Sequence, residues 1–481
     1  MMKTMILEKH PTLKIWLRFL LVVLPLPVIW ALANPMFASP DEPAHMVRAQ
    51  GIVHGDSKEP YETDGIPGGQ VMCMAFYWDT TADCMDLTWG SKGLVQGSPT
   101  DTYPPLFHAI AGIPSLFFNG LKGVYMMRLW MALVCSSIFA LAATLLWRRR
   151  QHIWSIGGLV AAMTPMVVFT SATVNPSGIT SALATLIWAG GLNITKPTDT
   201  TNARLSRWAF VTSVILFPLL RRDALAWEFV VLAILATTMS RKRFVELKKD
   251  RVMLGALIAV SVNMAFVWFT WSGTATDSFV SNSASHGGGS WAAGLGSLYT
   301  KILEMTGWFG WLDSPMTSES YVLLLCLLFG VIFIAATGGE KSLSRTLVIT
   351  FSALILAPVI IGTVRYPYVQ GRYLLPLWVG CGMIAGQALA ESELPKLFLR
   401  RLFKLFIGLM AVVQFFAFAQ NLRRYAVGRT GSWKFFQQSN WHPPMMSNLV
   451  ALLLMAAALS ISLFSVRSIC QTESSPQYSV S

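Results

Sequence analysis

Charged residues are scarce in this sequence. Of its 481 residues only 13% are Asp, Glu, Lys or Arg, whereas 54% are hydrophobic and the mean hydropathy is +0.52. A soluble globular protein carries about 25% charged residues. The apolar residues also occur in blocks of about 17–25, the length that crosses a bilayer as one helix. The composition excludes an ordinary soluble protein and predicts an all-α integral membrane protein.

Acids are scarcer than bases: 24 Asp and Glu stand against 37 Lys and Arg, giving a net charge of +13. Such an excess can indicate a nucleic-acid partner. The bases, however, gather in short segments between apolar blocks, as in "LLWRRRQ", "SRKRFVELKKDR" and "LPKLFLRRLFK". This is the pattern by which cytoplasmic loops orient membrane helices. We therefore expect no nucleic-acid partner.

The apolar blocks predict about twelve transmembrane helices. They lie near residues 15–37, 123–147, 153–173, 176–195, 206–220, 223–239, 252–272, 320–337, 346–363, 373–390, 402–419 and 446–466. The first block is too long for a signal-peptide core, and no clear small-x-small cleavage site follows it. We therefore expect it to be retained as the first span.

The placement of bases predicts the orientation of these spans. The basic loops at 148–152, 196–205, 240–251, 338–345 and 391–401 belong inside, and the stretches 38–122, 273–319 and 420–445 then lie outside. This gives a cytoplasmic N-terminus (1–14), a polytopic domain (15–466) with a large first extracytoplasmic loop (38–122), and a cytoplasmic tail (467–481). Within the first loop, "PLFHAIAGIPSLFF" predicts a helix on the outer leaflet.

Cysteine is also scarce, with six residues. Four of them fall in expected spans or in the cytoplasmic tail. Cys73 and Cys84 both fall in the first outer loop, and an oxidising compartment permits a bridge between them. We predict a Cys73–Cys84 disulfide; two free thiols are the alternative.

The first outer loop begins with "SPDEPAHMVRAQ". Ser39 and Glu42 have the spacing of a capping box, although Pro43 one turn in favours Asp41 as the cap. Capping explains one of the two adjacent acids, Asp41 and Glu42, but not both. It also does not explain why His45 and Arg48 follow them at helical spacing. The other interpretation is a catalytic site: a carboxylate, Asp41 or Glu42, takes the proton of an acceptor hydroxyl. A metal bound by Asp41, Glu42 and His45 is a lesser alternative, and we expect none.

Two expected outer turns carry cations. Arg365, Gln370 and Arg372 lie in "VRYPYVQGRYLLPLW", and Arg222 lies in "LLRRDALAW". The forked guanidinium of arginine suits the oxygens of a phosphate. Anchoring at the membrane interface explains the tyrosines of these turns, but it explains arginines less well, because the outer side has few basic residues. We therefore predict Arg365, Arg372, Gln370 and Arg222 as substrate contacts. For the second turn, pairing of Arg221, Arg222 and Asp223 with one another is the alternative.

Two further segments are expected on the outer side. In "GWFGWLDSP", Trp311 and Asp313 are suited to sugar or lipid contact, with a belt of interfacial tryptophans as the alternative. In "SATVNPSGITSALA", Asn175 precedes Pro176 and is expected to cap a helix.

Taken in order, "SPDEPAH", "YPPLFH", "VNPSG", "GWLD" and "VQGRYLLPL" resemble the bacterial membrane family known as domain of unknown function 2142. The resemblance runs from about Pro40 to about Gln387. That family resembles the GT-C class of integral membrane glycosyltransferases, which transfer sugars from polyprenyl phosphates on the far side of the membrane. It implies that Asp41 matches the first-loop acid acting as general base, with Glu42 beside it, and that the protein lies in the bacterial inner membrane. The chain departs from GT-C members that end in a folded soluble domain.

Two classes of function follow. The first is an inverting glycosyltransferase that uses a polyprenyl-phosphate sugar and modifies an envelope glycan or lipid. His45, Arg48 and the cations would contact substrate, and no cofactor is expected. No nucleotide-binding glycine loop occurs in the expected cytoplasmic segments, which fits a lipid-linked donor. The second is a transporter or flippase for a lipid-linked saccharide, and a noncatalytic partner in envelope assembly is a further alternative.

Overall fold

The computed structural model describes residues 11–56, 61–63, 72–86, 93–95, 100, 103–150, 152–198, 202–221, 223–271, 290–365 and 370–471. The helices of the bundle are α2 (Pro11–Val23), α3 (Pro25–Ala33), α6 (Gly120–Arg150), α7 (Ile153–Ala162), α8 (Pro165–Ser171), α9 (Pro176–Thr195), α10 (Ala203–Leu216), α11 (Ala224–Thr237), α13 (Arg251–Trp271), α15 (Trp291–Gly307), α16 (Ser318–Gly338), α17 (Lys341–Arg365), α18 (Leu375–Ala390), α19 (Lys396–Val427) and α20 (Asn448–Gln471).

Short elements join these helices. They are α4 (Glu42–His54), η1 (Ala82–Cys84), α5 (Leu106–Gly112), η2 (Ile113–Leu116), η3 (Phe217–Leu219), α12 (Arg241–Lys249) and η4 (Gly371–Leu374), with two antiparallel strand pairs, β1 (Tyr61–Thr63) with β2 (Gly93–Val95) and β3 (Trp308–Phe309) with β4 (Ser314–Pro315). In the register of the first pair Tyr61 lies opposite Val95, and in that of the second Trp308 lies opposite Pro315.

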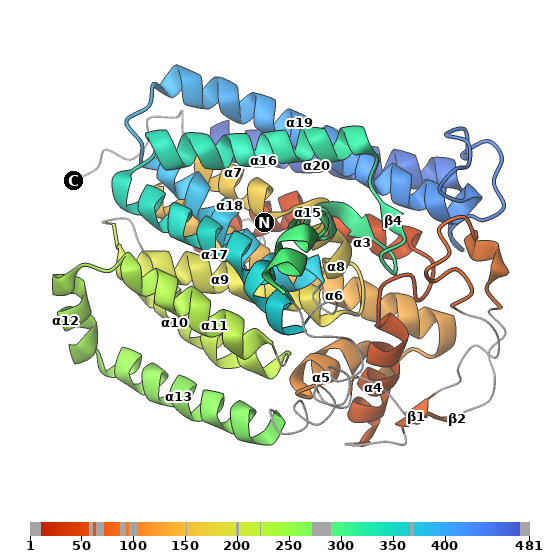
Figure 1. The fold of residues 1–481 in the computed structure, drawn as a ribbon, viewed down its shortest axis with the longest axis horizontal. Helices are drawn as coiled ribbons and strands as arrows, with labels where there is room; N and C mark the ends of the chain where they lie inside the picture. The colour runs from red at the N-terminus through yellow and green to blue at the C-terminus, as the bar shows by residue number, and fades with distance from the viewer. Residues whose placement is uncertain are drawn as a thin grey trace, which may run out of the picture.

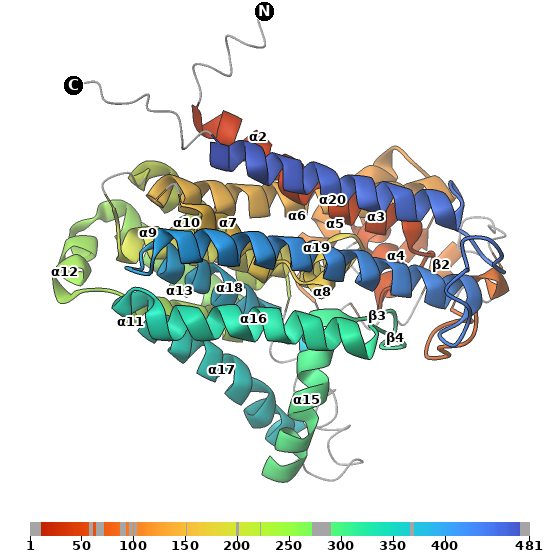
Figure 2. The same ribbon diagram turned by 90° about the horizontal axis from the view of Figure 1, so that it is seen from above.

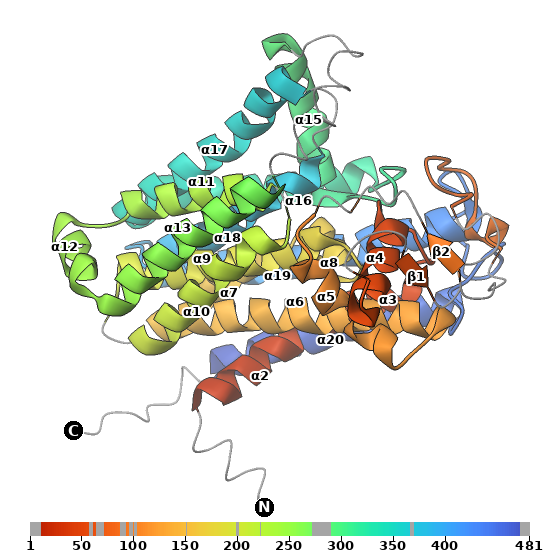
Figure 3. The ribbon, with the colours of Figure 1, turned by 90° about the horizontal axis from the view of Figure 1, so that it is seen from below.

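Most of the bundle helices run along the long axis of the molecule (Figure 1). The elements α4, α5, β1 and β2 lie at one end, which we call the site end. Helix α12 lies at the opposite end, which we call the basic end. Figure 2 and Figure 3 show α2 and α20 on one side of the bundle, with α15 and α17 projecting on the other. The start of α2 and the end of α20 lie towards the basic end, in line with the expectation that both termini share one side.

Helices α9 and α18 form the centre of the bundle. All twenty residues of α9 are buried, and α18 is buried from Leu375 to Leu389. Small residues allow this packing, since a Cβ at Gly386 of α18 would lie 2.5 Å from the Cα of Gly158 in α7. Close approach of backbones at small residues is typical of helix packing in membranes. Close packing in the core therefore fixes the positions of α9 and α18, and one end of each helix reaches the site end.

Among the described residues, nine helices are long and apolar enough to cross a membrane, or up to eleven if two bent pairs each count as a span. The expected number of twelve is therefore not confirmed. The span expected at 206–220 is the fourteen-residue α10 followed by η3, and α10 is shorter than the nine helices that are long enough to cross a membrane. The multi-helical membrane architecture itself is as the sequence predicts.

One expected span is bent rather than straight: residues 153–173 form α7 and α8, which meet at 71°. Helix α11 meets α12 at 120°, at the place where the expected span 223–239 gives way to the expected basic loop 240–251. Thr164 caps α8 ahead of Pro165, and Ser240 caps α12. The residue before a proline disfavours the helical conformation, so a helix tends to end there. A hydroxyl side chain that accepts a hydrogen bond from a backbone amide of the following turn caps the start of the next helix. The first bend turns α8 across the bundle towards the site end.

Candidate active site

Asp41 lies between α3 and α4 with its backbone in the left-handed region, at φ 63°. It occupies the cap position of α4, but its side chain makes no capping hydrogen bond. The capping box expected between Ser39 and Glu42 is also wrong, since Ser39 Oγ has no hydrogen-bond partner among the described residues and Glu42 bonds elsewhere. Non-glycine residues in this backbone region are uncommon and often mark functional sites.

The side chain of Asp41 instead meets Arg372. Its Oδ2 accepts a hydrogen bond of 2.7 Å from Arg372 Nη2, across 331 residues of sequence. Asp41 keeps 43% of its side chain exposed, whereas Arg372 keeps 5%. Arg372 also directs Nη1 to the carbonyl of Pro40 at 3.5 Å, a carbonyl that Asn175 Nδ2 reaches at 2.9 Å. The structure thus joins the acid and one of the arginines that the sequence singled out.

Glu42 has the opposite environment. Its side chain is fully buried and pairs with Arg128, whose Nε and Nη2 lie 2.9 and 2.5 Å from the two carboxylate oxygens. The Val174 amide donates to the same carboxylate at 3.0 Å. Arg128 in turn donates to the carbonyls of Asn34 and Pro35. Glu42 therefore fixes the exit of the chain from α3 and offers no exposed oxygen to a substrate.

A second arginine lies next to the Asp41–Arg372 pair. Arg221 stacks on the ring of Tyr373, with 3.8 Å from its guanidinium carbon to the ring centroid. It donates to Ser177 Oγ at 3.0 Å and pairs with Asp223 at 2.5 Å. The alternative of pairing within this turn is thus observed for Arg221 and Asp223. Arg222 lies outside the described residues.

His45 and His108 line the inner side of this cluster. Their Nδ1 and Nε2 atoms are 3.1 Å apart, and Tyr103 packs edge-on against His45. Burial, followed by the charges of Arg372, Arg221 and Arg48, lowers the pKa of His45 well below its usual value. Burial and the neighbouring His45 do the same to the pKa of His108. Both imidazoles are therefore neutral near pH 7, and one donates to the other.

Arg48 lies near the same two histidines, and its guanidinium donates to backbone carbonyl groups. Its Nη2 donates to the carbonyl of Tyr103 at 2.7 Å, and its Nη1 donates to the carbonyl of Thr100. These contacts hold the segment before α5 against α4. The described contacts of Arg48 are therefore ones that position Tyr103 and His108 around the cluster.

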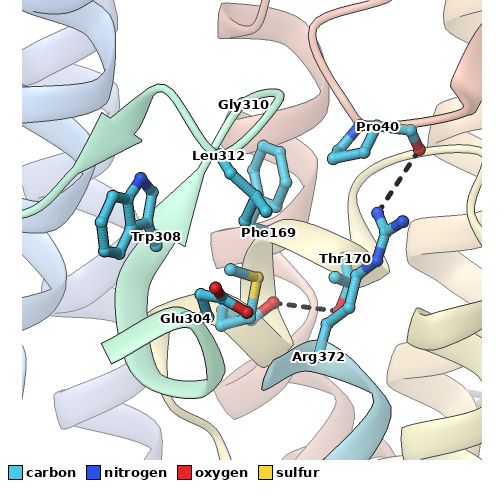
Figure 4. A pocket seen from close by; sticks show the side chains of 9 residues that line it. Pro40, Phe169, Thr170, Glu304, Trp308, Gly310, Leu312 and Arg372 are labelled. Carbon is cyan, nitrogen blue, oxygen red and sulfur yellow. Dashed lines mark hydrogen bonds between the residues drawn. The ribbon is translucent and has the colours of Figure 1, made fainter. Parts of the chain in front are cut away.

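A small cavity opens beside Arg372 (Figure 4). Its wall comes from the loop before α4, α8, α15, the β3–β4 turn and η4, through Pro40, Met166, Phe169, Thr170, Glu304, Trp308, Gly310, Leu312 and Arg372. In Figure 4 the guanidinium of Arg372 points to the carbonyl of Pro40, and Glu304 and Trp308 lie on the other side. One wall is thus cationic and the other is aromatic and acidic.

Glu304 was not anticipated from the sequence. Its carboxylate pairs with Lys301 at 2.9 and 3.1 Å and accepts the Gly371 amide at 2.6 Å. A Cβ at Gly371 would lie 2.3 Å from the carbonyl oxygen of Lys301. Only glycine allows η4 to approach α15 this closely, and this approach sets the position of Arg372 in the next residue.

Other predicted substrate contacts lie away from this cavity. Trp311 donates from Nε1 to the carbonyl of Phe37 at 2.9 Å. Asp313 pairs with Arg424 at 3.0 Å and accepts the Phe76 amide at 3.1 Å. Arg424 also donates to the carbonyls of Met74, Tyr77 and Thr80 in the first loop. These residues hold the first loop to the β3–β4 turn.

Four further sequence predictions remain. The structure links Cys73 and Cys84 by a disulfide, with Cα atoms 6.2 Å apart, in the loop that Arg424 holds. Asn175 caps α9 through its Oδ1, as predicted. Gln370 precedes η4, and its Oε1 is buried without a hydrogen-bond partner among the described residues. Arg365 ends α17, and its side chain is outside the described part.

The residues that sequence reasoning missed are Arg128, His108 and Glu304. An arginine near the end of an apolar block was the available signal for Arg128, because an intramembrane charge needs a partner. Within the described part of the chain, no three His, Cys, Asp or Glu side chains converge in a way that could hold a metal.

The arrangement of helices is shared with a known structure. Over 95% of this chain and 78% of the other, it resembles the crystal structure of ArnT from Cupriavidus metallidurans bound to undecaprenyl phosphate, with a TM-score of 0.51 and 12% identity. The fold is therefore that of the GT-C glycosyltransferases. The oligosaccharyltransferase of Archaeoglobus fulgidus, tethered to an acceptor peptide, gives a TM-score of 0.41 at 13% identity, over 88% of this chain and 56% of that one.

No curated protein sequence matches the chain. A family described as "Predicted membrane protein (DUF2142)" matches residues 24–381, which include α4, η4 and every residue of the Asp41 cluster. The motifs that suggested this family in the sequence fall within or close to that range. The chain therefore belongs to the DUF2142 family of membrane proteins.

Proposed function

We propose that this protein is a glycosyltransferase that moves a sugar from a polyprenyl-phosphate donor to an envelope glycan or lipid, on the extracytoplasmic side of the bacterial inner membrane. The observation that carries the proposal is the Asp41–Arg372 pair. It sets a half-exposed carboxylate 2.7 Å from a buried guanidinium beside a cavity. An acid that accepts a proton and a cation that stabilises a phosphate are the two groups that this transfer needs.

In the proposed reaction Asp41 accepts the proton of the acceptor hydroxyl. The hydroxyl oxygen forms a bond to the anomeric carbon, while the bond between that carbon and the phosphate oxygen breaks. The leaving polyprenyl phosphate takes the electron pair of the broken bond, and Arg372 and Arg221 stabilise its growing negative charge. A single displacement of this kind inverts the configuration at the anomeric carbon.

Glu42 takes a different part in this proposal from Asp41. Since its oxygens are buried against Arg128 and the Val174 amide, it is a positioning residue that holds the chain on which Asp41 is mounted. The neutral His45 and His108 pair adds no charge to this cluster, in which Arg372 pairs with Asp41 and Arg221 pairs with Asp223.

The lipid part of the donor fits the surface next to the cavity. Helix α15, which carries Glu304, exposes Trp291, Leu295 and Tyr299. On the other flank η2 and the residues after it expose Leu116 and Phe117. A polyprenyl chain lying along α15 would keep its phosphate at Arg372, because α15 packs directly against η4 through Gly371.

One observation favours a second candidate, a proton-coupled flippase for a lipid-linked saccharide. Glu228 of α11 is fully buried, and neither carboxylate oxygen has a hydrogen-bond partner among the described residues. The contacts Ser177–Arg221 and Thr195–Thr238 place α11 along α9, with Glu228 between them inside the bundle. Intramembrane acids of this kind occur in proton-driven transporters.

The test uses purified full-length protein in liposomes with synthetic polyprenyl-phosphate sugars and a panel of envelope acceptors. The transferase proposal expects glycosylated acceptor and free polyprenyl phosphate without any ion gradient. Movement of intact donor across the bilayer that depends on a proton gradient and on Glu228, with no glycosylated product, would instead establish the flippase.

A further inference from the structure

A second cavity lies at the basic end of the bundle, far from Asp41. It lies between the end of α9, the start of α10, α12 and the start of α13, and is partly open to the outside. Its lining is mixed, with apolar and polar side chains, from Asn193, Ile194, Pro197, Ala203, Ser206, Arg207, Arg243, Leu247, Asp250 and Met253. Nothing in the proposed transfer reaction uses this cavity.

Two arginines that line this cavity, Arg207 and Arg243, have more N–H donors than their described contacts use. Arg207 reaches Asp250 through Nη1 alone, at 3.1 Å. Arg243 donates from Nε to the carbonyl of Ile194 at 2.8 Å and from Nη1 to Glu246 at 3.0 Å. A guanidinium has five N–H donors, so both arginines keep donors that no described residue accepts. Within the lining itself, the two arginines face one acid, Asp250.

A buried acceptor lies at the inner end of the same cavity. Asn193 is 2% exposed and donates from Nδ2 to Ser206 Oγ at 3.0 Å and to the Leu145 carbonyl at 3.3 Å. Because a carbonyl cannot donate, this second bond fixes the orientation of the amide. Asn193 Oδ1 then has no hydrogen-bond partner among the described residues. The cavity therefore combines Asn193 Oδ1, which can accept a hydrogen bond from a hydroxyl or an amine, with Arg207 and Arg243, which can bind an anion.

Helix α12 adds a basic, exposed surface beside the cavity. It carries Arg241, Lys242, Arg243, Lys248 and Lys249 against the single acid Glu246, and it has no buried residue. Phe244 and Val245 are half exposed on it. Helix α12 is bent sharply from α11 and leads into α13, both apolar helices, at one end of the bundle (Figure 1). Basic clusters next to membrane helices attract anionic lipids.

We propose that this cavity binds the headgroup of an anionic phospholipid that carries a free hydroxyl, as phosphatidylglycerol does. The phosphate accepts hydrogen bonds from Arg207 and Arg243, and the glycerol hydroxyl donates to Asn193 Oδ1. The acyl chains leave along the apolar lining formed by Leu247 and Met253. The site would anchor α12 and α13 to the bundle through a lipid at the end opposite the candidate active site.

The test is native mass spectrometry of delipidated full-length protein titrated with palmitoyl-oleoyl phosphatidylglycerol, with phosphatidylethanolamine of the same chains as reference. One tightly bound phosphatidylglycerol is expected. Each basic residue near an anionic lipid surface contributes roughly fivefold to binding, so Arg207→Gln/Arg243→Gln should weaken binding of this lipid about 25-fold. Arg207→Gln alone, which removes a partly exposed side chain, should weaken it about fivefold.

The matched control is Arg400→Gln/Arg401→Gln, which removes two exposed charges from the start of α19 and should leave binding unchanged. Equal affinity for the two lipids would overturn the proposal, and so would full phosphatidylglycerol binding by the Arg207→Gln and Arg207→Gln/Arg243→Gln variants. Soluble glycerol 3-phosphate is the third arm. Displacement of the lipid by an equal concentration of glycerol 3-phosphate would show a site for a free phosphate and contradict a lipid site.

Discussion

Asp41 and Glu42 are neighbours in sequence with opposite environments, and the backbone of Asp41 is the reason. Its left-handed conformation, at φ 63°, ends the extended exit from α3 and starts α4 at the next residue. The turn directs one carboxylate towards the exposed side of Arg372 and the next into the bundle against Arg128. A short polar residue such as Asp accepts this backbone conformation more readily than a bulky or branched one.

The buried partner gives the first prediction. Glu42→Gln removes the charge that compensates Arg128 and should lower the free energy of unfolding by about 3 kcal/mol or more, the cost of breaking a buried ion pair. Thermal unfolding in detergent measures the loss, and Glu319→Gln, on the exposed first turn of α16, is the control. If Glu42→Gln unfolds at the wild-type temperature, the ion pair does not hold the exit of α3.

Arg372 gives the second prediction. Its guanidinium contacts both Asp41 and the Pro40 carbonyl, which needs a fork of N–H groups. Arg372→Lys keeps the charge and loses the fork, so kcat/KM for the donor should fall roughly tenfold or more, the worth of a charged hydrogen bond. Arg372→Ala should fall further, with expression and topology unchanged. Full catalytic efficiency in Arg372→Lys would make this arginine an interfacial anchor, because lysine snorkels equally well.

At the scale of the element, the placement of η4 against α15 decides where Arg372 lies. A methyl group at Gly371 would meet the backbone of Lys301 and Met305 at 2.3 and 2.5 Å, and backbone cannot move aside as a side chain does. The position of the cation in the site is thus set by a glycine one residue before it.

The third prediction follows from this contact. Gly371→Ala should destabilise the protein by about 1–3 kcal/mol, as overpacking does, and should lower activity by more than its effect on stability explains. Gly296→Ala in α15, the helix against which η4 packs, is the matched control. No described atom lies within 4 Å of a Cβ placed at Gly296. Thermal unfolding and donor turnover of the two variants decide the matter. Equal behaviour of both would show that η4 shifts freely.

The contact between α4 and α5 should depend on pH. Both His45 and His108 have pKa values lowered well below the usual value by burial, so the unfolded chain binds more protons than the folded one. The groups that face the pair are Arg372, Arg221, Arg48, Tyr103 and Asp41. Stability is then fully present above a pH of about 6.5 and falls as the pH drops below it.

The fourth prediction is therefore a lower unfolding temperature at pH 5.5 than at pH 7.5, with hydrogen exchange rising first in α4 and α5. The double variant His45→Phe/His108→Phe should lose most of this pH dependence. A wild-type protein whose α4 and α5 amides exchange equally slowly at both pH values would contradict the neutral, buried pair.

Element boundaries also show what the sequence could predict. Long apolar blocks such as 123–147 and 320–337 predict α6 and α16 because length and composition suffice for a spanning helix. The break at Pro165 was missed, since hydropathy does not distinguish a bend from a straight span, whereas the end of α11 before Ser240 agrees with the expected span 223–239. The break at Pro165 matters for the site, because α8 brings Phe169 and Thr170 to the cavity.

The same limit applies to the site residues. Asp41 and Arg372 could be found from the sequence because each is a charge at an expected outer end of a span. That Glu42 is buried against Arg128, or that Asp313 pairs with Arg424, could not be predicted, since both facts depend on how distant helices pack. Glu304 gave no signal, because its role follows from the approach of Gly371 to α15.

At the scale of the whole molecule, polar function is divided between the two ends of one apolar bundle. The site end carries the Asp41–Arg372 pair, with Arg372 lining a cavity, and the basic end carries α12 and a second cavity. The fold is shared with ArnT, and the chain belongs to the DUF2142 family. The chemistry of that site is the central claim.

The most direct test of this claim is the single-turnover rate of Asp41→Asn with a polyprenyl-phosphate sugar donor in liposomes. If Asp41 is the general base, Asp41→Asn should be properly inserted, unfold like the wild type and react about 10²–10⁴-fold more slowly, the usual loss with a general base. Asp83→Asn, which neutralises an exposed acid remote from the cavity, should keep the wild-type rate. Transfer by Asp41→Asn at a rate close to that of Asp83→Asn would contradict the account.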